Sequence, residues 1–518
     1  MPGIAGLVTT DPTPSRSEIE RMIRPLQRLA SHRADRYAAD CAALAAISPD
    51  GERALSHRGG VWLGLAGAVV EETELYARLR RHDGFVGPVE TQADLLLELY
   101  LAYGLPGVIN LNGSYALAVW EEQDDRLTLV RDRLGTANLY TWSRPGRLMF
   151  ASEYKAITWH PDFNKRIDEV ALTDFFTYHQ VMLDRTFFTD VRMLPPGGAL
   201  IVQAGRVTLH SHWDLTFGPR DQPALTPDGW VDAFAERLAV AVKRRMQPHA
   251  CLFLTGGLDS RSIAGMAQKV APEQPLQTAT VGSQAGTDAQ VARGIAAALG
   301  YPHALVELSG DYLARYAAQC AWRAEGKLNA FGSWIYAGED YLHARGLRAA
   351  MTGVFGNPVS GRHFPDILAF VRSEGQMRWA MEAAFSSRKR ALARVFKPAL
   401  VAGAGDQSMR VFVDALVQSG APTIYGKYDE MYFRVAVPRL AHNADVLGDQ
   451  ARVFDPFTDR DLVDFAIHMP PAVRAGGNFF KRMIVRHLPE AAAVVHGRTG
   501  RLLADDLRSD RFRLTQYA

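Results

Sequence analysis

The segment Ala250–Gly265, ACLFLTGGLDSRSIAG, carries the residue types best suited to chemistry. An apolar strand is predicted to end at Leu254 and to run into Thr255, Gly256 and Gly257, and a helix opens directly afterwards. Glycines let backbone N–H groups approach an anion closely, and a helix start adds unpaired donors and the positive end of the helix dipole. The segment therefore predicts a loop that holds phosphate.

Three side chains add polar groups to this loop. Thr255 and Ser260 supply hydroxyl donors, and Asp259 has a carboxylate that suits the Mg²⁺ accompanying nucleotide phosphates. A tight turn with Asp259 or Ser260 as helix N-cap is the alternative that the glycine pair alone leaves open. The string has neither the GK[ST] of a Walker A loop nor the GxGxxG of a dinucleotide-binding loop.

Composition excludes several classes of protein. The chain has 518 residues, of which 47% are hydrophobic and 22% charged, as in soluble globular proteins of two or three domains. Its 58 basic and 56 acidic residues nearly balance, which argues against binding to nucleic acid through bulk charge. Three scattered cysteines form no zinc or disulfide pattern, and we find no signal peptide or bilayer-length apolar run, so we expect a cytoplasmic protein.

The pattern of apolar residues in the first half of the chain predicts a mixed sheet-and-helix domain. Short alternating apolar stretches such as Ser114–Trp120 predict strands, and helices are expected between them, for example at Ala93–Tyr103. Thr216–Gly229 is rich in Pro, Gly and Asp without periodicity, which indicates a linker. We therefore expect a first domain over residues 1–215 and a second over 216–518.

The second half alternates helices and short buried strands before a mostly helical final part. This alternation predicts a doubly wound α/β sheet of parallel strands, with ligands at the carboxyl ends of the strands. The expected elements are a helix at Trp230–Arg245, a strand at Ala250–Leu254, a helix from about Ser260 to Val270, a strand at Gln277–Val281 and a helix at Ala289–Leu299.

The phosphate loop resembles the SGGxDS pyrophosphate loop of the N-type ATP pyrophosphatases, with Thr255 for the first Ser. Further segments are similar to those of the asparagine synthetase family, in family order: HRAD (His32–Asp35), LNGSYALAVWEE (Leu111–Glu122), RDRLGTANLY (Arg131–Tyr140), LPPGGALIV (Leu194–Val202), TDAQVARGIAAALGYPH (Thr287–His303), ARVFDPFTDRDLVDFAIHMP (Ala451–Pro470) and KRMIVRHLPE (Lys481–Glu490). The chain is identified as a member of that family. The resemblance implies an α+β Ntn-hydrolase-like sandwich followed by an α/β ATP-pyrophosphatase domain.

The resemblance also implies ATP and Mg²⁺ as cofactors. Proteins with this loop cleave ATP between the α and β phosphates, form an adenylate and release pyrophosphate, and a nitrogen or sulfur nucleophile then attacks the activated carbon. By this resemblance the strand end at Val281 and Gly282 would cup the adenine. The full set of expected nucleotide-binding residues is Leu254, Thr255, Gly256, Gly257, Asp259, Ser260, Val281, Gly282, Thr352 and Gly353.

The synthetase half departs from the family at its third phosphate-site motif, which falls at Thr352–Pro358 (TGVFGNP). Asn357 takes the place of a Mg²⁺-binding Asp, and we assign it as a metal ligand with Asp259, although it offers a carbonyl oxygen without charge. Val354 takes the place of the catalytic Glu. Arg498 aligns with the lysine that stabilises developing charge, keeping the charge but not its point-like geometry. Arg498 and Asp259 are the expected catalytic residues.

The amino-terminal half departs from the family's glutaminase. That enzyme uses a cysteine after the initiator methionine, in MCGIAG, whereas this chain begins MPGIAG, and Pro2 has no thiol to form a thioester. The family's glutamine-holding NGE segment is not recognisable, and its nearest counterpart is Gly64–Leu75 (GLAGAVVEETEL). These two losses predict a domain kept for structure, in a member akin to lasso-peptide cyclases and β-lactam synthetases.

We therefore expect an ATP-dependent, AMP-forming amide synthetase that joins a small-molecule or peptide carboxylate to an amine not taken from glutamine. Lasso-type macrolactam formation and amidation in a natural-product or glycan pathway stay open, while β-lactam formation is disfavoured because β-lactam synthetases carry a tyrosine where Val354 stands. The alternatives are an ammonia-dependent asparagine synthetase and a non-catalytic partner or scaffold protein. Transfer to a nucleic-acid base is disfavoured by the near-neutral charge, and a homodimer or a pathway-protein partner is conceivable.

Overall fold

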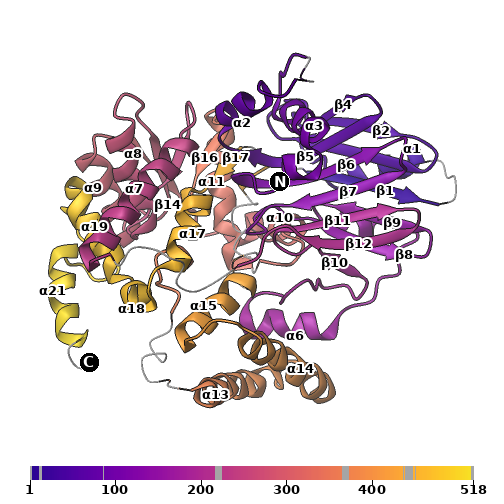
Figure 1. Cartoon of the computed structure of the whole chain (residues 1–518). Helices are drawn as coiled ribbons and strands as arrows, with labels where there is room; N and C mark the ends of the chain where they lie inside the picture. The colour runs from indigo at the N-terminus through magenta and orange to yellow at the C-terminus, as the bar shows by residue number, and fades with distance from the viewer. Residues whose placement is uncertain are drawn as a thin grey trace.

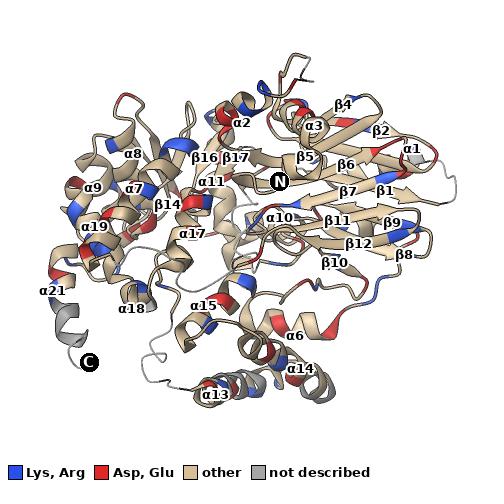
Figure 2. Ribbon diagram, in the orientation of Figure 1, with Lys and Arg blue, Asp and Glu red and all other residues tan. Residues whose placement is uncertain are grey.

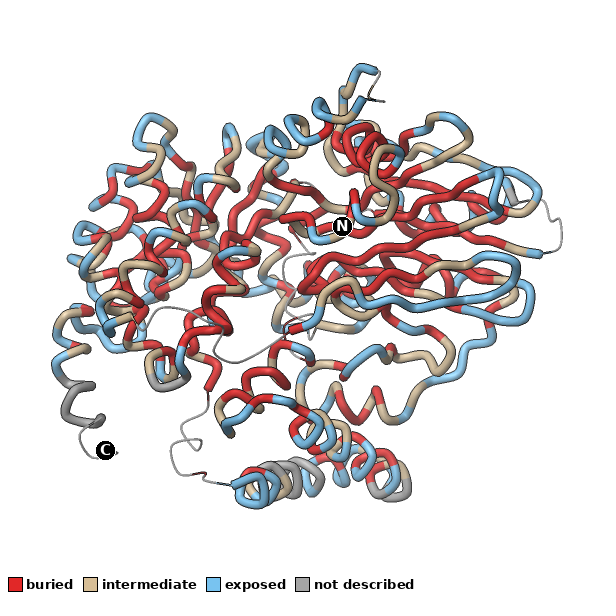
Figure 3. Tube along the Cα trace, in the orientation of Figure 1, coloured by how far each residue is buried: buried red, intermediate tan, exposed pale blue. Residues whose placement is uncertain are grey.

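The computed structural model describes residues 3–10, 15–83, 85, 87–215, 225–328, 330–364, 371, 373–435, 437, 447–449 and 451–514. A two-sheet sandwich forms the first part of the chain, and a parallel sheet flanked by helices forms the second (Figure 1). Figure 3 shows that the strands of both parts are mostly buried. Met1, Pro2 and residues 216–224 of the expected linker lie outside the described residues, so the domain boundary at 215 stays a prediction.

The sandwich consists of two six-stranded sheets in which the paired strands run antiparallel. The first sheet has the order β10 (Val191–Met193), β8 (Tyr140–Arg144), β9 (Arg147–Ala151), β1 (Ile4–Thr9), β3 (Ala42–Ser48), β2 (Arg33–Ala38). The second has the order β12 (Arg206–Ser211), β11 (Gly198–Gln203), β7 (Arg126–Arg131), β6 (Gly113–Glu121), β5 (Val61–Val69), β4 (Leu55–Arg58). The helices are α1 (Ser15–Ile23), α2 (Glu72–Leu79), α3 (Gln92–Tyr103), α4 (Leu105–Val108), α5 (Lys155–Thr158) and α6 (Glu169–Tyr178).

The alternation along β6 explains the layering of the sandwich. Ala116 and Ala118 face the core between the two sheets, whereas Leu117 and Val119 face the core that includes α3. Successive strand residues point to opposite faces, so one strand serves both cores. The Ntn-hydrolase-like sandwich expected from the sequence is confirmed, and the helix expected from Ala93 begins one residue earlier, where Thr91 caps it.

The second part is built on a five-stranded sheet in which every pairing is parallel. Its order is β15 (His303–Glu307), β14 (Gln277–Gly282), β13 (Cys251–Phe253), β16 (Ala349–Met351), β17 (Arg452–Phe454). The chain runs outward from β13 through β14 to β15 and then returns to the other side of β13. The strand order therefore reverses between β13 and β16, the point at which open α/β sheets bind ligands. The expected parallel α/β domain is confirmed.

Helices flank this sheet and form most of the remaining chain. The first group is α7 (Pro227–Arg245), α8 (Asp259–Val270), α9 (Thr287–Ala298), α10 (Tyr312–Arg323), η1 (Ala330–Trp334), α11 (Ile335–Ala344) and α12 (Gly356–Val359). The second group is α13 (Glu374–Leu392), α14 (Pro398–Val417), α15 (Ile424–Val435), η3 (Pro456–Thr458), α17 (Arg460–His468), α18 (Pro471–Arg474), η4 (Ala475–Gly477), α19 (Asn478–His487), α20 (Pro489–Ala492) and α21 (Leu503–Leu514). In Figure 1, α13 and α14 lie beside α6 of the sandwich.

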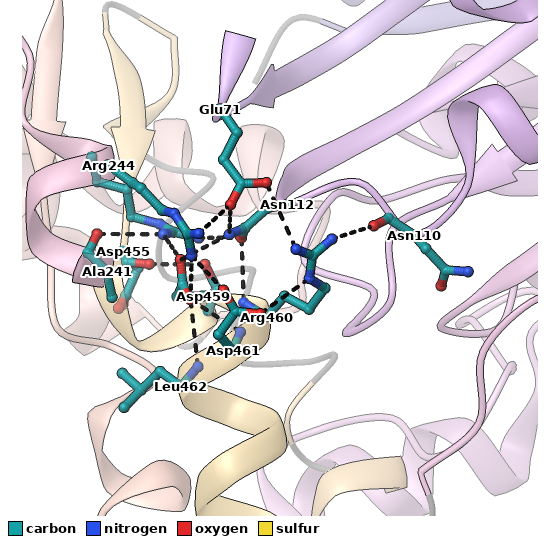
Figure 4. Close-up of polar contacts among 12 residues, drawn as sticks. Glu71, Asn110, Asn112, Ala241, Arg244, Asp455, Asp459, Arg460, Asp461 and Leu462 are labelled. Atoms are coloured by element: carbon teal, nitrogen blue, oxygen red, sulfur yellow. Dashed lines mark hydrogen bonds and ion pairs between the residues drawn. The ribbon is translucent and has the colours of Figure 1, made fainter. Parts of the chain in front are cut away.

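A buried ion pair within the second part hydrogen-bonds to the sandwich at the junction of the two parts, which Figure 4 shows. Asp459, at the start of α17, accepts a hydrogen bond of 2.7 Å from Arg245 Nη1 and one of 2.8 Å from Asn112 Nδ2 of the sandwich. Arg245 Nη2 in turn donates to Asn112 Oδ1 at 2.9 Å. Burial opposes the charge of Asp459, but Arg245 keeps its pKa below the ordinary value. Hydrogen bonds from this buried ion pair to Asn112 therefore help to hold the two parts together.

Charged residues of both signs are interspersed over the two parts of the chain (Figure 2). Such mixing produces no extended field of one sign, in keeping with the near-neutral total of +2. Within the described residues, no helix combines the length and the apolar character needed to cross a membrane.

Candidate functional site

The predicted phosphate loop connects β13 to α8 at the carboxyl edge of the parallel sheet. Thr255 N–H donates to Ser260 Oγ at 3.0 Å, and Gly257 N–H donates to Thr255 Oγ1 at 3.3 Å. The first residue of α8 is Asp259, and no side chain caps the helix. The N–H groups of its first turn therefore lack acceptors within the helix, which is the arrangement that binds phosphate.

Two neighbouring segments fix the shape of this loop at Gly256. The Gly256 N–H donates to Asp288 Oδ1 of α9 at 3.1 Å, and its carbonyl accepts the N–H of Gly497 at 3.1 Å. A Cβ on Gly256 would lie 2.9 Å from Asp288 Oδ1 and 3.2 Å from the Cα of Gly497, so a larger residue would displace Asp288 and press on the segment at Gly497. The contact places the segment that carries the exposed Arg498 directly beside the loop.

Asp259 lies against the third motif of the predicted site. A Cβ on Gly353 would be 2.8 Å from the Asp259 Cβ, and one on Gly356 would be 2.2 Å from Asp259 Oδ1. Arg362 Nη2 donates to the same Oδ1 in an ion pair. Burial raises the pKa of the Asp259 carboxyl, and Arg362 acts against that rise. The structure thus brings the first and third motifs together through a contact that the sequence did not predict.

The remaining predicted nucleotide residues lie on neighbouring strand ends. Leu254 is buried, and its carbonyl accepts the Thr280 hydroxyl at 2.5 Å, which ties β13 to β14. The side chain of Val281 packs in an apolar cluster with α10 and α11, so only its backbone faces the edge. A Cβ on Gly282 would meet nothing within 4 Å, so the end of β14 is open.

Asp455 is a buried carboxyl beside Thr352 that sequence reasoning did not assign to the site. It accepts N–H bonds from Phe355 at 3.0 Å and Phe457 at 2.9 Å, and the Thr352 hydroxyl lies 3.3 Å away. Burial raises its pKa to about 7, although these N–H groups favour the charged form. The only sequence signal was that Asp455 is the first residue of the DPF string within the family-like segment Ala451–Pro470.

Asp455 is expected to make stability depend on pH. The folded protein keeps its proton up to about pH 7, whereas the unfolded chain releases it above the ordinary value of 3.8. The contribution of Asp455 to the free energy of unfolding is therefore complete below that ordinary value and is lost as the pH rises to about 7. Between about pH 5 and pH 8 the free energy of unfolding should fall by about 2 to 3 kcal/mol. Urea unfolding at both pH values should show a smaller loss in Asp455→Asn than in the wild type. Equal losses would contradict the assignment.

The predicted metal ligands do not form a metal-binding set. Asp259 is already paired with Arg362, and Asn357 is exposed and uncharged. The part of the chain that the structure describes contains no group of three or more His, Cys, Asp or Glu residues arranged to hold a metal. Val354 packs partly buried against the main apolar core, so it offers no polar group to the site. Magnesium at Asp259 and Asn357 stays a prediction, and these contacts do not fit it.

The first described residues of the sandwich are tightly packed directly after position 2, where the family's glutaminase has its nucleophile. Pro2 lies outside the described residues, but Ile4 N–H donates to Ser152 Oγ at 3.0 Å, and a Cβ on Gly3 would be 2.2 Å from that atom. Glu71, from the nearest counterpart of the NGE segment, pairs with Arg244 Nη2 at 2.8 Å across the domain junction (Figure 4). Its carboxylate therefore belongs to the junction.

Two family models match the chain in sequence. Residues 1–213 match the glutamine amidotransferase domain, and residues 233–401 match asparagine synthase. "Amidase chry2" of Gibberella zeae is 27% identical over 70% of this chain and 56% of its own length. "Asparagine synthetase [glutamine-hydrolyzing] 2" of Bacillus subtilis is 28% identical, covering 50% and 36%, and "Carboxyethyl-arginine beta-lactam-synthase" of Streptomyces clavuligerus is 28% identical, covering 50% and 47%.

The chain spans only about a third to somewhat more than half of the length of these relatives. The first matched range nevertheless covers the antiparallel sandwich, and the second covers β13, β14, β15 and β16 of the parallel sheet but not β17. The phosphate loop, Asp259 and the third motif meet at the edge of that parallel sheet. By this combination the chain belongs to the asparagine-synthetase-like proteins.

Proposed function

We propose that this chain is an ATP-dependent ligase that activates a substrate carboxylate as an adenylate and joins it to an amine without hydrolysing glutamine. The observation that carries the proposal is the uncapped start of α8 at the loop Thr255–Leu258, with Asp259 and the third motif packed against it. Helix starts with free N–H donors bind the phosphates of nucleotides. The similarity to asparagine synthetases and to a β-lactam synthase supports amide-bond formation as the outcome.

The proposed reaction has two steps. A carboxylate oxygen attacks the α-phosphate of ATP, the bond between the α and β phosphates breaks, and pyrophosphate leaves into the loop at the start of α8. The amine then attacks the acyl carbon and gives up one proton to the solvent, and AMP leaves with the electron pair of the broken acyl–oxygen bond. Arg498, whose segment contacts Gly256, would stabilise charge on the leaving phosphates. The protein contributes mainly positioning and charge.

The absence of glutamine hydrolysis rests on residue chemistry in the amino-terminal domain. Pro2 stands where a thiol would be needed, and an amide cannot be cleaved through a thioester without one. The Gly64–Leu75 stretch sends Glu71 into the junction with Arg244, away from any role in holding glutamine. The amine is therefore proposed to come from the acceptor itself, in a lasso-type macrolactam or in a natural-product or glycan amide. Free ammonia, as in an ammonia-dependent asparagine synthetase, is the remaining source.

A non-catalytic role is the second candidate, and the Asp259–Arg362 pair favours it. The pair engages the carboxylate that the resemblance assigns to metal binding, and Val354 and Asn357 replace two acidic residues of the third motif. Magnesium would supply charge neutralisation for the phosphates if it were bound, but Asp259 and Asn357 do not form a fitting ligand set, and no step here depends on it. A protein that binds ATP without turnover could act as a partner or scaffold.

Pyrophosphate release separates these candidates. The purified full chain would be incubated with ATP and panels of peptide, amino-sugar and amino-acid carboxylates, with aspartate plus ammonia as one panel member. ATP-dependent pyrophosphate release with a carboxylate supports the ligase, and isothermal titration measures ATP affinity in parallel. If ATP binds and no panel member elicits release, the scaffold candidate is favoured. If ATP does not bind at all, the ligase proposal fails.

Arg498→Ala is expected to lower the rate of pyrophosphate release by about a hundredfold, because removing one donor to developing charge costs that much in other enzymes. The fold should be unaffected, since Arg498 is exposed. Arg501→Ala, an exposed arginine in the same segment, is the matched control and should release pyrophosphate at the wild-type rate. Equal rates in the two variants would remove Arg498 from the site.

A further inference from the structure

The ion pair between Asp259 and Arg362 joins residues 103 positions apart beside the phosphate loop. Arg362 lies in the turn after α12, and its Nη2 donates to Asp259 Oδ1. The side chain of Arg362 is 21% exposed and that of Asp259 is 23% exposed. Such limited exposure keeps bulk water from screening the pair as it would at the surface, yet leaves an opening through which a ligand can reach it.

Two glycines provide the space that the Asp259 carboxylate occupies. A Cβ on Gly356 would lie 2.2 Å from Asp259 Oδ1, and a Cβ on Gly353 would lie 2.8 Å from the Asp259 Cβ. Real Cβ atoms do not come this close to their neighbours, so any other residue at either position would push Asp259 away. The third motif has therefore kept the backbone space for Asp259 while losing its acidic side chains.

The Arg362 side chain is held along its whole length. A Cβ on Gly477 would lie 2.2 Å from the Arg362 Cγ, so the aliphatic stem fits directly over that glycine, whose φ is +69°. Arg362 Nε donates to Ser360 Oγ at 2.8 Å, and its guanidinium carbon lies 5.5 Å from the centre of the Phe480 ring. Stem, Nε and ring together direct the guanidinium to Asp259, so the pair is built into the turn.

A carboxylate next to a phosphate loop requires a nearby positive charge, because Asp259 and a bound phosphate would otherwise repel each other. Among the described residues there is no metal-binding group of three or more His, Cys, Asp or Glu, and Asn357 brings no negative charge to attract a cation. Arg362 is the cation found on Asp259. It offers five N–H donors in a planar fork that matches phosphate oxygens, and only Nε and Nη2 are engaged in the contacts described above.

We propose that Arg362 takes the place of a divalent cation at the phosphate loop, so that ATP and pyrophosphate bind this protein with little dependence on magnesium. The inference rests on the proposed nucleotide site and specifies how that site neutralises phosphate charge. Asp259 orients the guanidinium through Nη2, and the remaining N–H groups bind phosphate oxygens. Asn357 stands where the family has an acidic metal ligand, and Arg362 supplies the positive charge that the metal would supply. Pyrophosphate is then bound by an arginine and not by a metal.

The test measures dissociation constants of the full chain for ATP and for inorganic pyrophosphate, in EDTA and in excess magnesium. The wild type should bind both ligands in EDTA within about fivefold of its affinity in magnesium. Arg362→Gln should weaken binding in EDTA by about ten- to a hundredfold, since a hydrogen bond to a charged group is lost. Magnesium should recover part of that loss, because Asp259 becomes free to attract a cation.

Two further variants keep the result interpretable. Arg362→Lys retains the charge without the fork and should fall between the wild type and Arg362→Gln, and Arg508→Gln changes a surface arginine of α21 and should behave as the wild type. Circular dichroism and thermal melting confirm that each variant is folded. Strict magnesium dependence of the wild type, unchanged in Arg362→Gln, overturns the inference but leaves the proposed function standing. Tighter binding by Arg362→Gln would show instead that the pair closes the site, and no binding under any condition overturns both proposals.

Discussion

Asp259→Ala is expected to lower ATP-dependent pyrophosphate release by about a hundred- to a thousandfold, the largest effect on activity that the site predicts. The Asp259 carboxylate holds the guanidinium of Arg362 beside the predicted phosphate loop, and among the described residues it is the carboxylate that pairs with that guanidinium. Without it, Arg362 can turn to solvent, and the loop loses its ordered positive charge. Release is measured with a carboxylate that the wild type accepts, and ATP affinity is measured alongside.

The fold should survive this substitution. Both partners are about one fifth exposed, so the unpaired Arg362 can be hydrated and the loss of stability should stay near 1 kcal/mol. Asp505→Ala, a half-exposed aspartate in the first turn of α21, is the matched control and should retain full activity. Wild-type turnover by Asp259→Ala, with intact folding, would refute the assignment of this site.

Asp459→Asn is expected to lower the free energy of unfolding by about 3 to 5 kcal/mol, the largest effect on stability at the domain junction. Asp459 and Arg245 have side chains only 1% and 2% exposed, and Arg245 Nη1 lies 2.7 Å from Asp459 Oδ2. Asparagine has nearly the same shape and still accepts the N–H groups of Asp461 and Leu462 that begin α17. The substitution therefore removes the charge and leaves Arg245 buried without compensation.

Asp461→Asn is the matched control for this prediction. Asp461 lies at the same start of α17 as Asp459 and pairs with Arg244 of α7. Its side chain is 46% exposed, so loss of this ion pair should lower the free energy of unfolding by less than about 1 kcal/mol. Urea unfolding gives both values, and a second substitution, Arg245→Met in the Asp459→Asn background, should recover part of the loss because the unpaired charge is gone. Equal costs for the two asparagine variants would show that the junction does not depend on the buried pair.

Local patterns in the sequence were sufficient to predict the elements around the phosphate loop. The helix expected over Trp230–Arg245 is α7, which begins three residues earlier because Thr226 accepts the Gly229 N–H at 3.0 Å and Pro227 starts the helix. The strand expected over Ala250–Leu254 is β13, shortened to Cys251–Phe253, the residues that pair with β14, of which Cys251 and Leu252 also pair with β16. Apolar periodicity and turn residues act over a few positions, so they identify elements well and their ends less well.

The contacts between distant segments were not predicted. Arg362 meets Asp259, Asp288 meets Gly256, and neither pairing has a spacing or a pattern that indicates it. Asp288 lay within a segment similar to the family, and Asp455 lay within another, so both could have been proposed as neighbours of the loop. Arg362 gave no such signal, because its partner is selected by the packing of α12 and η4 around the site.

The sequence by itself determined that position 2 carries no thiol, since proline lacks one in any conformation, and that a glycine pair followed by Asp259 forms a loop between a strand and a helix. Both are properties of covalent structure and of hydrogen bonds between near neighbours. Only the tertiary structure decided which charge neutralises Asp259 and which residues hold the two domains together. These pairings depend on where backbones from distant segments leave room, as at Gly356 and Gly477, and on which charges become buried there without water.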